Sequence, residues 1–154
     1  GYAGDEEKAC RCSAGDRQRY TNRVSGPLLD RIDLRVRVPR VSAETLLSES
    51  EEESSAFIAQ RVARCRKLQI KARGRPNAQL SGDALMQACD LTTSTTAFIA
   101  EAADRLQFSG RAVHRLLRVA RTIADLRGDE RVERVTILEA LACRESLGSE
   151  ERSA

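Results

Sequence analysis

The chain has 154 residues, of which 41% are apolar, only 3% are aromatic and none is tryptophan, so a core of Leu, Ile, Val and Ala favours packed helices over an aromatic-rich β-sandwich. The net charge of +3 is far from that of a dedicated nucleic-acid-binding module. No run approaches the ~20 apolar residues of a membrane helix, and five cysteines, an odd number, argue against a secreted disulfide framework. We therefore expect a cytoplasmic protein with no membrane partner.

The first 40 residues predict a small remnant of an α/β structure. Residues 13–24 can form a short helix with Ser13 as its N-cap, and the breaker Ser25-Gly26-Pro27 ends it. Residues 32–38 alternate apolar and polar side chains, which predicts a strand with one buried face. A single strand is unstable in water, so its partners are expected N-terminal to this chain. Residues 1–40 are accordingly expected to be partly disordered.

The remainder predicts helices separated by short turns. A single turn is expected over residues 43–48, and an acidic, serine-rich connector follows it. Longer helices are predicted from Ser54 to Arg73, from Ser81 through Cys89, from Thr92 or Thr93 through Leu106, from Ser109 to Leu126, and from Arg134 to Leu147. Side chains expected to face inward include Ile58, Val62, Cys65 and Gln69 on the first of these helices and Ile137, Leu138 and Leu141 on the last.

No complete active site is evident. The chain contains neither the phosphate-binding loop GxxxxGK[ST] nor an apolar strand that ends in an acidic pair able to hold magnesium. His114 is the only histidine, and no Ser-His-Asp or Cys-His arrangement is visible. A free-standing enzyme is therefore not expected.

The most specific segment is S-G-P-L-L-D-R-I-D-L, residues 25–34. It resembles the arginine-finger motif of magnesium-chelatase-like AAA+ ATPases, in which L-L-D-R-[IF]-D precedes a core strand. The resemblance implies that Arg31 projects toward the γ-phosphate of ATP on a neighbouring subunit, where a guanidinium stabilises the charge of the transition state. From the residues alone, Arg31 could instead pair with Asp30 or Asp33 at a strand edge.

A second arginine motif lies on the helix after Ser109. Four arginines at spacings of four, three and three form one basic stripe: Arg111, Arg115, Arg118 and Arg121. A solvated charged face is the ordinary meaning of such a stripe, and Arg121 with Asp125 one turn later fits it. The segment also resembles the sensor-2 helix of the same family. That resemblance implies nucleotide contact by Arg111, near the helix N-terminus, with Arg115 as the alternative.

The cysteines predict no metal site in this chain. Cys10-x-Cys12 resembles the second half of a C-P-C-G and C-x-C set found in the family, and four such thiolates could bind zinc. Two alone should not hold it. Cys65, Cys89 and Cys143 are interpreted as small core residues. Residues 73–82 resemble the family's linker between lid helices, in which Asn77 is expected to have a structural role.

Together, the motifs identify the chain as resembling the C-terminal portion of a magnesium-chelatase-like AAA+ protein, of the branch related to bacterial competence proteins. The expected fold is mainly α. Residues 1–40 are expected to be the C-terminal end of the α/β ATPase core, and residues 41–53 a connector between that core and the lid. Residues 54–148 are expected to form the helical lid domain, and residues 149–154 a disordered tail. The resemblance implies ATP and Mg²⁺ in the full-length protein, neighbouring subunits in a ring, expected to be a hexamer, and DNA as a further partner.

This chain by itself is expected to hold no cofactor and to be inactive as an ATPase, because it lacks the phosphate-binding motifs. One alternative is a stand-alone helical module that binds nucleic-acid phosphates through the stripe from Arg111 to Arg121. Another is a purely structural oligomerisation domain. Tight, steeply salt-dependent DNA binding would favour the first alternative.

Overall fold

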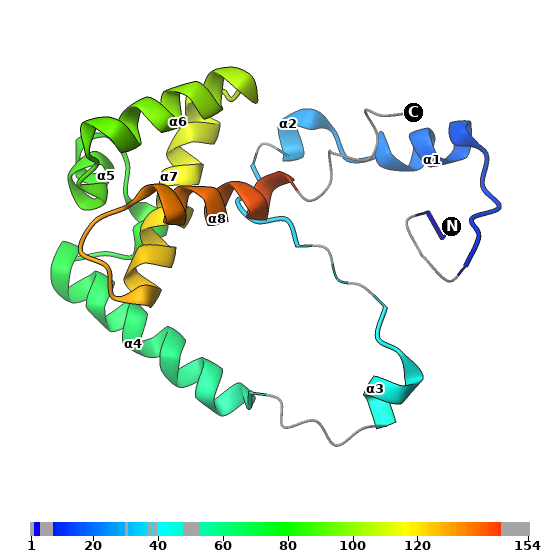
Figure 1. The fold of residues 1–154 in the computed structure, drawn as a ribbon, viewed down its shortest axis with the longest axis horizontal. Helices are drawn as coiled ribbons and strands as arrows, with labels where there is room; N and C mark the ends of the chain where they lie inside the picture. Colours follow the sequence, from blue (N-terminus) through cyan, green and yellow to red (C-terminus); the bar gives the residue numbers. More distant parts are fainter. Residues whose placement is uncertain are drawn as a thin grey trace. The chain divides into compact units, whose positions relative to one another are not determined.

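The computed structural model describes residues 2–3, 8–29, 31–36, 38, 40–47 and 53–145. These residues form eight α-helices and one 3-10 turn, with no strand among them (Figure 1). The expectation of a mainly α chain is thus confirmed. The chain divides into two compact units, one spanning Gly1–Ile32 and Val36–Glu51, the other Asp33–Arg35 and Glu52–Ala154.

The first unit contains three short helices and no buried residue among those described. They are α1 (Ala14–Thr21), α2 (Gly26–Leu29) and α3 (Ala43–Leu47). Ser13 caps α1 as predicted: its side chain accepts a hydrogen bond from the Asp16 amide, and the Asp16 carboxylate accepts one from the Ser13 amide. Tyr20 of α1 remains 73% exposed. The unit therefore lacks a core of its own in its described part.

The predicted strand over residues 32–38 is wrong for the part of it that the structure describes. Residues 32–36 and 38 form no strand, and the side chains expected on the buried face are 40% to 82% exposed: Ile32, Leu34, Val36 and Val38. An alternating pattern produces a strand only where a neighbouring strand satisfies its backbone groups. Residues 33–35 instead join the second unit, where the Arg35 amide donates to the Cys143 carbonyl at 2.7 Å.

The second unit is a bundle of five helices with one 3-10 turn. These are α4 (Ser55–Arg73), η1 (Asn77–Gln79), α5 (Gly82–Cys89), α6 (Thr93–Arg105), α7 (Gly110–Arg127) and α8 (Arg134–Glu145). At Ser54, Thr92 and Ser109, where helices are predicted to start, the side chain accepts a hydrogen bond from a backbone amide and so caps the helix. Ser81 precedes α5 but makes no side-chain capping bond.

Glycines end the two longest helices. Gly74 follows α4 with φ of 71°, and Gly128 follows α7 with φ of 86°. Both values lie in the left-handed region, which glycine adopts without the Cβ clash that other residues meet. The predicted ends of these helices are therefore confirmed by local backbone chemistry.

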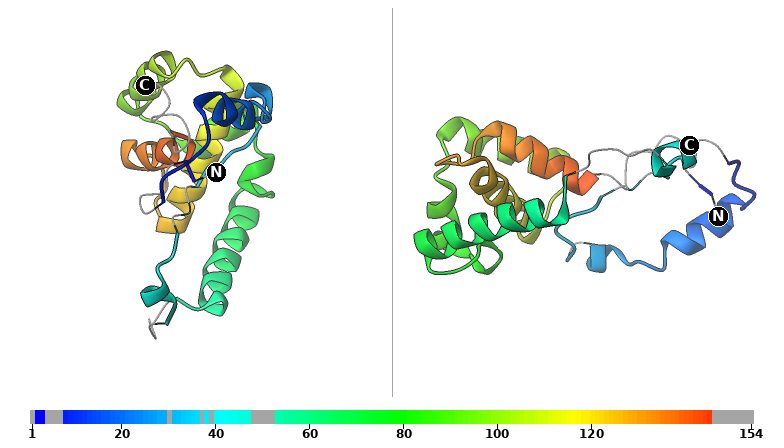
Figure 2. Two further views of the ribbon diagram at one scale, coloured as in Figure 1. Left: turned by 90° about the vertical axis from the view of Figure 1, so that its right-hand side faces the viewer. Right: turned by 90° about the horizontal axis from the view of Figure 1, so that it is seen from below.

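The core of the second unit gathers around α7, which contacts α4, α5, α8 and η1 (Figures 1 and 2). It consists of Leu80, Leu85, Cys89, Ile99, Leu116, Leu117, Ala120, Ala124, Val132, Ile137, Ala140 and Leu141. Leu138 was expected to face inward but is 50% exposed, because α8 presents only its Ile137 and Leu141 side to α7.

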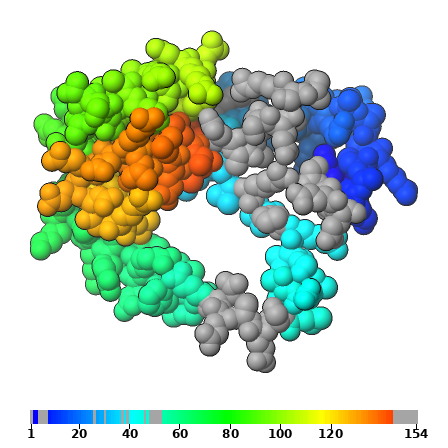
Figure 3. All heavy atoms as spheres, viewed as in Figure 1, coloured from blue at the N-terminus to red at the C-terminus, as the bar shows by residue number. Residues whose placement is uncertain are grey.

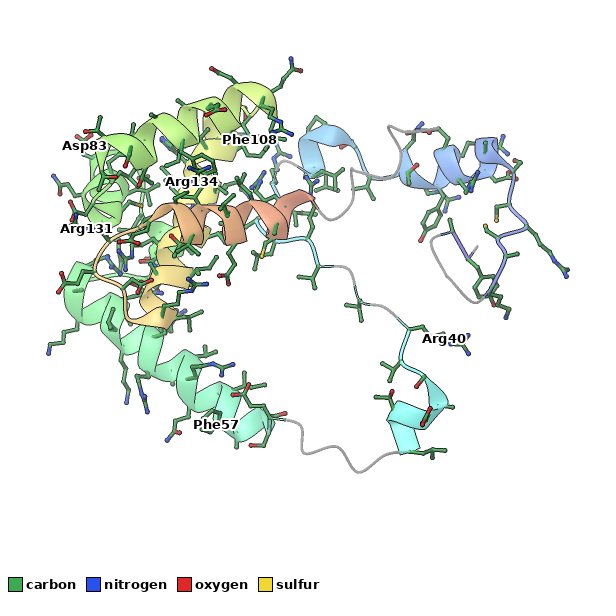
Figure 4. All side chains as sticks on the ribbon, viewed as in Figure 1. Arg40, Phe57, Asp83, Phe108, Arg131 and Arg134 are labelled. Atoms are coloured by element: carbon green, nitrogen blue, oxygen red, sulfur yellow. The ribbon has the colours of Figure 1, made fainter. Side chains whose placement is uncertain are left out.

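The buried residues of α4 all lie in its C-terminal half. Cys65 and Gln69 are buried as predicted, whereas Ile58 is 40% and Val62 is 54% exposed. The N-terminal half of α4 extends past the other helices of the unit, with Phe57 near its end (Figure 4). In the space-filling view the atoms of α4 are uncovered along the lower edge of the unit (Figure 3).

Residues 146–154 lie outside the described residues, so the predicted helix end at Leu147 and the predicted tail over residues 149–154 do too. Among the helices that the structure describes, none combines the length and the apolar character needed to cross a membrane.

Candidate functional site

Arg121 of α7 is a buried structural residue, with 1% of its side chain exposed. Its Nε donates to Asp125 Oδ1 at 3.0 Å, and its two terminal nitrogens donate to the carbonyls of Ala88, Asp129 and Glu130 at 2.6–3.2 Å. The alternative interpretation of the stripe as a solvated face is therefore wrong at Arg121, although the pairing of Arg121 with Asp125 is confirmed. A guanidinium tolerates burial when its donors and its charge are both satisfied, as they are here.

A polar network around Asp125 connects α4, η1 and α7. Arg73 binds the Asp125 carboxylate with two hydrogen bonds, at 2.8 and 2.9 Å. Asn77 Nδ2 donates to Asp125 Oδ2 at 2.7 Å and to Thr122 Oγ1 at 3.1 Å. The backbone amide of Asn77 donates to Gln69 Oε1 at 3.2 Å. Asn77 thus has a structural role, as expected, but as the centre of a buried network. The sequence signal was only an Asn in a polar turn and an Asp one helical turn after Arg121.

The charge of Asp125 is stabilised by this network. Burial would by itself raise the pKa of the carboxyl, but hydrogen bonds from Arg73 and Asn77, together with the positive charge of Arg121, outweigh burial and hold the pKa below its ordinary value. Asp125 therefore carries its negative charge at neutral pH and forms ion pairs with both Arg73 and Arg121.

Arg118 and Arg115 also donate hydrogen bonds to other residues of this chain. Arg118 is half-buried and donates to the Leu80 carbonyl at 3.2 Å. Arg115 forms an ion pair with Asp33 at 2.7 Å, with 18% of the arginine and 44% of the aspartate side chain exposed. Asp33 belongs to the motif that resembles an arginine finger, and Arg115 belongs to the helix that resembles sensor 2. The structure thus brings these two motifs into contact through a pair that the sequence did not predict.

Arg111 differs from the other three arginines of the stripe. It is exposed in the first turn of α7, directly after the Ser109 cap, and makes no hydrogen bond or ion pair with any residue that the structure describes. The N-terminus of a helix is its positive end, so a cation there is unfavourable to the helix unless an anion is bound nearby. The four arginines therefore do not form one open basic surface.

Arg31 lies in the turn that follows α2. Its amide donates to the Leu28 carbonyl at 2.9 Å, and its side chain is exposed. Arg31 belongs to the first unit, whereas Arg111 and Arg115 belong to the second.

The cysteines separate into two environments. Cys65 and Cys89 are buried, as predicted, while Cys10, Cys12 and Cys143 are half-buried. Burial raises the pKa of Cys89 to about 11, whereas hydrogen bonds from the backbone of Cys12 and Tyr2 lower that of Cys10. Among the described residues, no group of three or more His, Cys, Asp and Glu side chains is placed to hold a metal ion.

Comparison with protein families gives two matches that cover most of the chain. Residues 52–144 match the family described as magnesium chelatase, subunit ChlI C-terminal, and residues 1–46 match magnesium chelatase, subunit ChlI. The boundary between the matches falls in the acidic connector.

Several curated proteins are similar to this chain over most of its length. The competence protein ComM of Haemophilus influenzae is 38% identical over 127 residues, which are 82% of this chain and 25% of ComM. The uncharacterised protein YifB of Escherichia coli is 38% identical over 136 residues, 87% of this chain and 27% of YifB. An uncharacterised protein of Mycobacterium tuberculosis is 40% identical over 124 residues, 77% of this chain and 24% of that protein. The chain thus spans about a quarter of the length of these relatives.

Proposed function

This chain belongs to the family of the magnesium chelatase subunit ChlI, and on that premise we propose that it supplies arginines to the ATP sites of a ring-forming AAA+ ATPase. Arg31 serves as the arginine finger and Arg111 as the sensor-2 residue. The remaining parts of each site, including the loop that cradles the phosphates, come from sequence outside this chain.

The observation that carries the proposal is the contrast along α7. Arg115, Arg118 and Arg121 all bind carboxylates or carbonyls of this chain. Arg111 is exposed and makes no such contact with the described residues, so its five N–H donors are available to a ligand. This contrast favours Arg111 over Arg115, which would first have to leave Asp33.

The chemistry of phosphate fits both positions. A planar guanidinium binds two oxygens of a phosphate through a rigid fork of parallel N–H donors, whereas a lysine ammonium acts as a point charge. At Arg111 the positive end of α7 adds to this attraction. At Arg31 the guanidinium would stabilise the charge that spreads over the γ-phosphate oxygens in the transition state. When bound in the full-length protein, Mg²⁺ would supply further positive charge to stabilise the transition state.

We further propose that the full-length protein works in the cytoplasm as a ring, expected to be a hexamer, that couples ATP hydrolysis to the processing of DNA. The name of the H. influenzae relative, competence protein, supports a link to DNA uptake. The rival proposal of a nucleic-acid module built on the stripe from Arg111 to Arg121 loses its support. Arg121 is 1% exposed, and Arg115 and Arg118 are engaged within the bundle.

A complementation experiment on the full-length protein tests Arg31. Subunits with Arg31→Ala are expected to lose ATPase activity, and subunits with a defective phosphate-binding loop are expected to lose it too. Mixing the two should restore activity, because each then supplies what the other lacks at a shared site. Arg66→Ala is the matched control, since the Arg66 side chain is exposed and forms no hydrogen bond or ion pair with the described residues. Normal ATPase activity of Arg31→Ala alone would refute the finger assignment.

Nucleotide affinity distinguishes Arg111 from Arg115. In the full-length protein, Arg111→Ala is expected to raise the Kd for a fluorescent ATP analogue about ten-fold or more, as loss of one charge-assisted contact of about 1.5–3 kcal/mol requires. Arg115→Ala is expected to change it less. The reverse order would move the sensor-2 role to Arg115.

A further inference from the structure

The outer face of α4 carries a concentration of positive charge that the ATP site does not use. The helix holds six cationic side chains and no Asp or Glu: Arg61, Arg64, Arg66, Lys67, Lys71 and Arg73. The whole chain is nearly balanced, with 26 basic and 23 acidic residues. Two of its three lysines are on this helix. α4 therefore carries more net positive charge than any other described helix, including α7 with its five arginines and one aspartate.

Two of the six cations are neutralised within the chain. Arg73 binds the buried Asp125, and Arg61 binds Glu53 with hydrogen bonds of 2.6 and 3.0 Å. The other four are exposed and form no ion pair or hydrogen bond with the described residues: Arg64, Arg66, Lys67 and Lys71.

Three of these cations align with an exposed aromatic ring. Phe57, Gln60, Arg64, Lys67 and Lys71 follow one another at spacings of three, four, three and four, so they lie on one face of the helix. Phe57, Gln60 and Arg64 also line a common shallow hollow. The buried residues Cys65 and Gln69 lie on the face toward α7, so the row from Phe57 to Lys71 faces away from the core. Phe57 is 57% exposed.

We propose that this row, the α4 outer face, binds single-stranded nucleic acid. Arg64 and Lys71 are seven residues apart, about 10 Å along a helix at 1.5 Å per residue. In a duplex each strand carries one phosphate per ~3.4 Å of helix axis, so this length spans about three phosphates of a strand that keeps that stacked spacing and fewer of an extended one. Phe57 extends the same row by two turns and offers a ring on which an unpaired base can stack, which is how single strands are held without sequence preference.

The α4 outer face complements the proposed work on DNA by naming where this chain touches the strand, and it does not rest on Arg31 or Arg111. Charge complementarity identifies a polyanion as the partner, because no carboxylate of the described chain neutralises these cations. The exposed ring selects a single strand over a duplex, whose bases are already stacked.

Fluorescence anisotropy with a labelled oligo-dT of about 20 nucleotides tests the proposal on the chain itself, without nucleotide cofactor. Replacing Arg64, Lys67 and Lys71 together by Ala should lower affinity at least ten-fold at low salt. The slope of log affinity against log salt should become shallower by about 2, since each cation on a single strand contributes about 0.7. Phe57→Ala should weaken binding roughly five-fold or more and leave the slope unchanged.

The matched control removes three other exposed arginines whose side chains form no hydrogen bond or ion pair with the described residues: Arg17, Arg23 and Arg105. It changes the net charge equally and should reduce affinity less than three-fold. Circular dichroism verifies that each variant is folded, which is expected because the replaced side chains are exposed.

Three results would overturn the proposal: no binding of oligo-dT at low salt, an equal loss in the control variant, or a tighter complex with a duplex of the same length. A polyglutamate peptide that binds as tightly through the same three cations would reassign the α4 outer face to an acidic protein surface. Since the assay contains no ATP, each of these results leaves the proposed ATP-site arginines standing.

Discussion

Replacing Asp125 by Asn should severely destabilise the helical bundle. The substitution keeps the shape of the side chain but removes its charge, and it turns one acceptor oxygen into an NH₂ donor. In the native chain both oxygens accept hydrogen bonds, from Arg73, Asn77 and Arg121. The new NH₂ group would therefore point at donors, and the guanidinium of Arg121 would stay buried without its counter-charge.

The magnitude follows from the burial of the partners. Arg121 and Asp125 are each 1% exposed and Arg73 is 15% exposed, so water screens these pairs little. Removing one partner of a buried ion pair costs about 3–5 kcal/mol. Since a domain is typically stable by about 5–15 kcal/mol, this loss removes a large share of the free energy of unfolding.

Urea denaturation of the chain, followed by circular dichroism at 222 nm, measures the effect. The midpoint should fall sharply for Asp125→Asn, with ΔG obtained by linear extrapolation. Asp104→Asn is the matched control, because Asp104 is an exposed aspartate of another helix whose side chain forms no hydrogen bond or ion pair with the described residues. It should change stability by less than about 0.5 kcal/mol. A loss below about 1 kcal/mol for Asp125→Asn, with an unchanged m-value, would refute the view that this network holds α4 to α7.

Two further predictions concern titratable groups. Because the folded-state pKa of Asp125 is lowered, its contribution to stability is complete above its unfolded pKa of about 3.9 and is lost as the pH falls through the folded value. The difference in unfolding free energy between the native chain and Asp125→Asn should therefore be constant from about pH 5 to 7 and shrink below about pH 4; a constant difference down to pH 2 would contradict the assignment. Cys10, with its lowered pKa, should react with iodoacetamide at pH 7.5, whereas Cys89, buried and with a pKa of about 11, should react only after unfolding, as peptide mass spectrometry of both states would show.

The sequence was most informative where a structural feature depends on neighbours in the chain. Ser54, Thr92 and Ser109 accept capping bonds from amides three residues away, and Gly74 and Gly128 end helices through their own backbone angles. Each of these contacts closes within one helical turn, so residue type and spacing suffice to predict it. The mainly α fold and the order of its long helices followed from such signals.

Predictions failed where burial depends on which helices meet. A stripe of four arginines on α7 has the same spacing whether it faces solvent or the core, and nothing in that spacing indicates that Arg121 is buried. Its guanidinium binds the carbonyls of Ala88, Asp129 and Glu130, which are too distant in the sequence for the helical repeat to predict these contacts. The alternating pattern of residues 32–38 likewise fails to form a strand in its described part, because strand pairing depends on a partner chain segment.

The family, the helix ends and the candidate arginines Arg31 and Arg111 were thus determined by the sequence alone, because each is written in short motifs. Only the tertiary structure decided which arginines are available to a ligand. It binds Arg115 to Asp33 and buries Arg121 against Asp125, and it leaves Arg111 exposed at the start of α7. The physical reason is that a guanidinium's availability depends on which acceptors the fold brings within about 3 Å of it, and those acceptors come from distant parts of the chain.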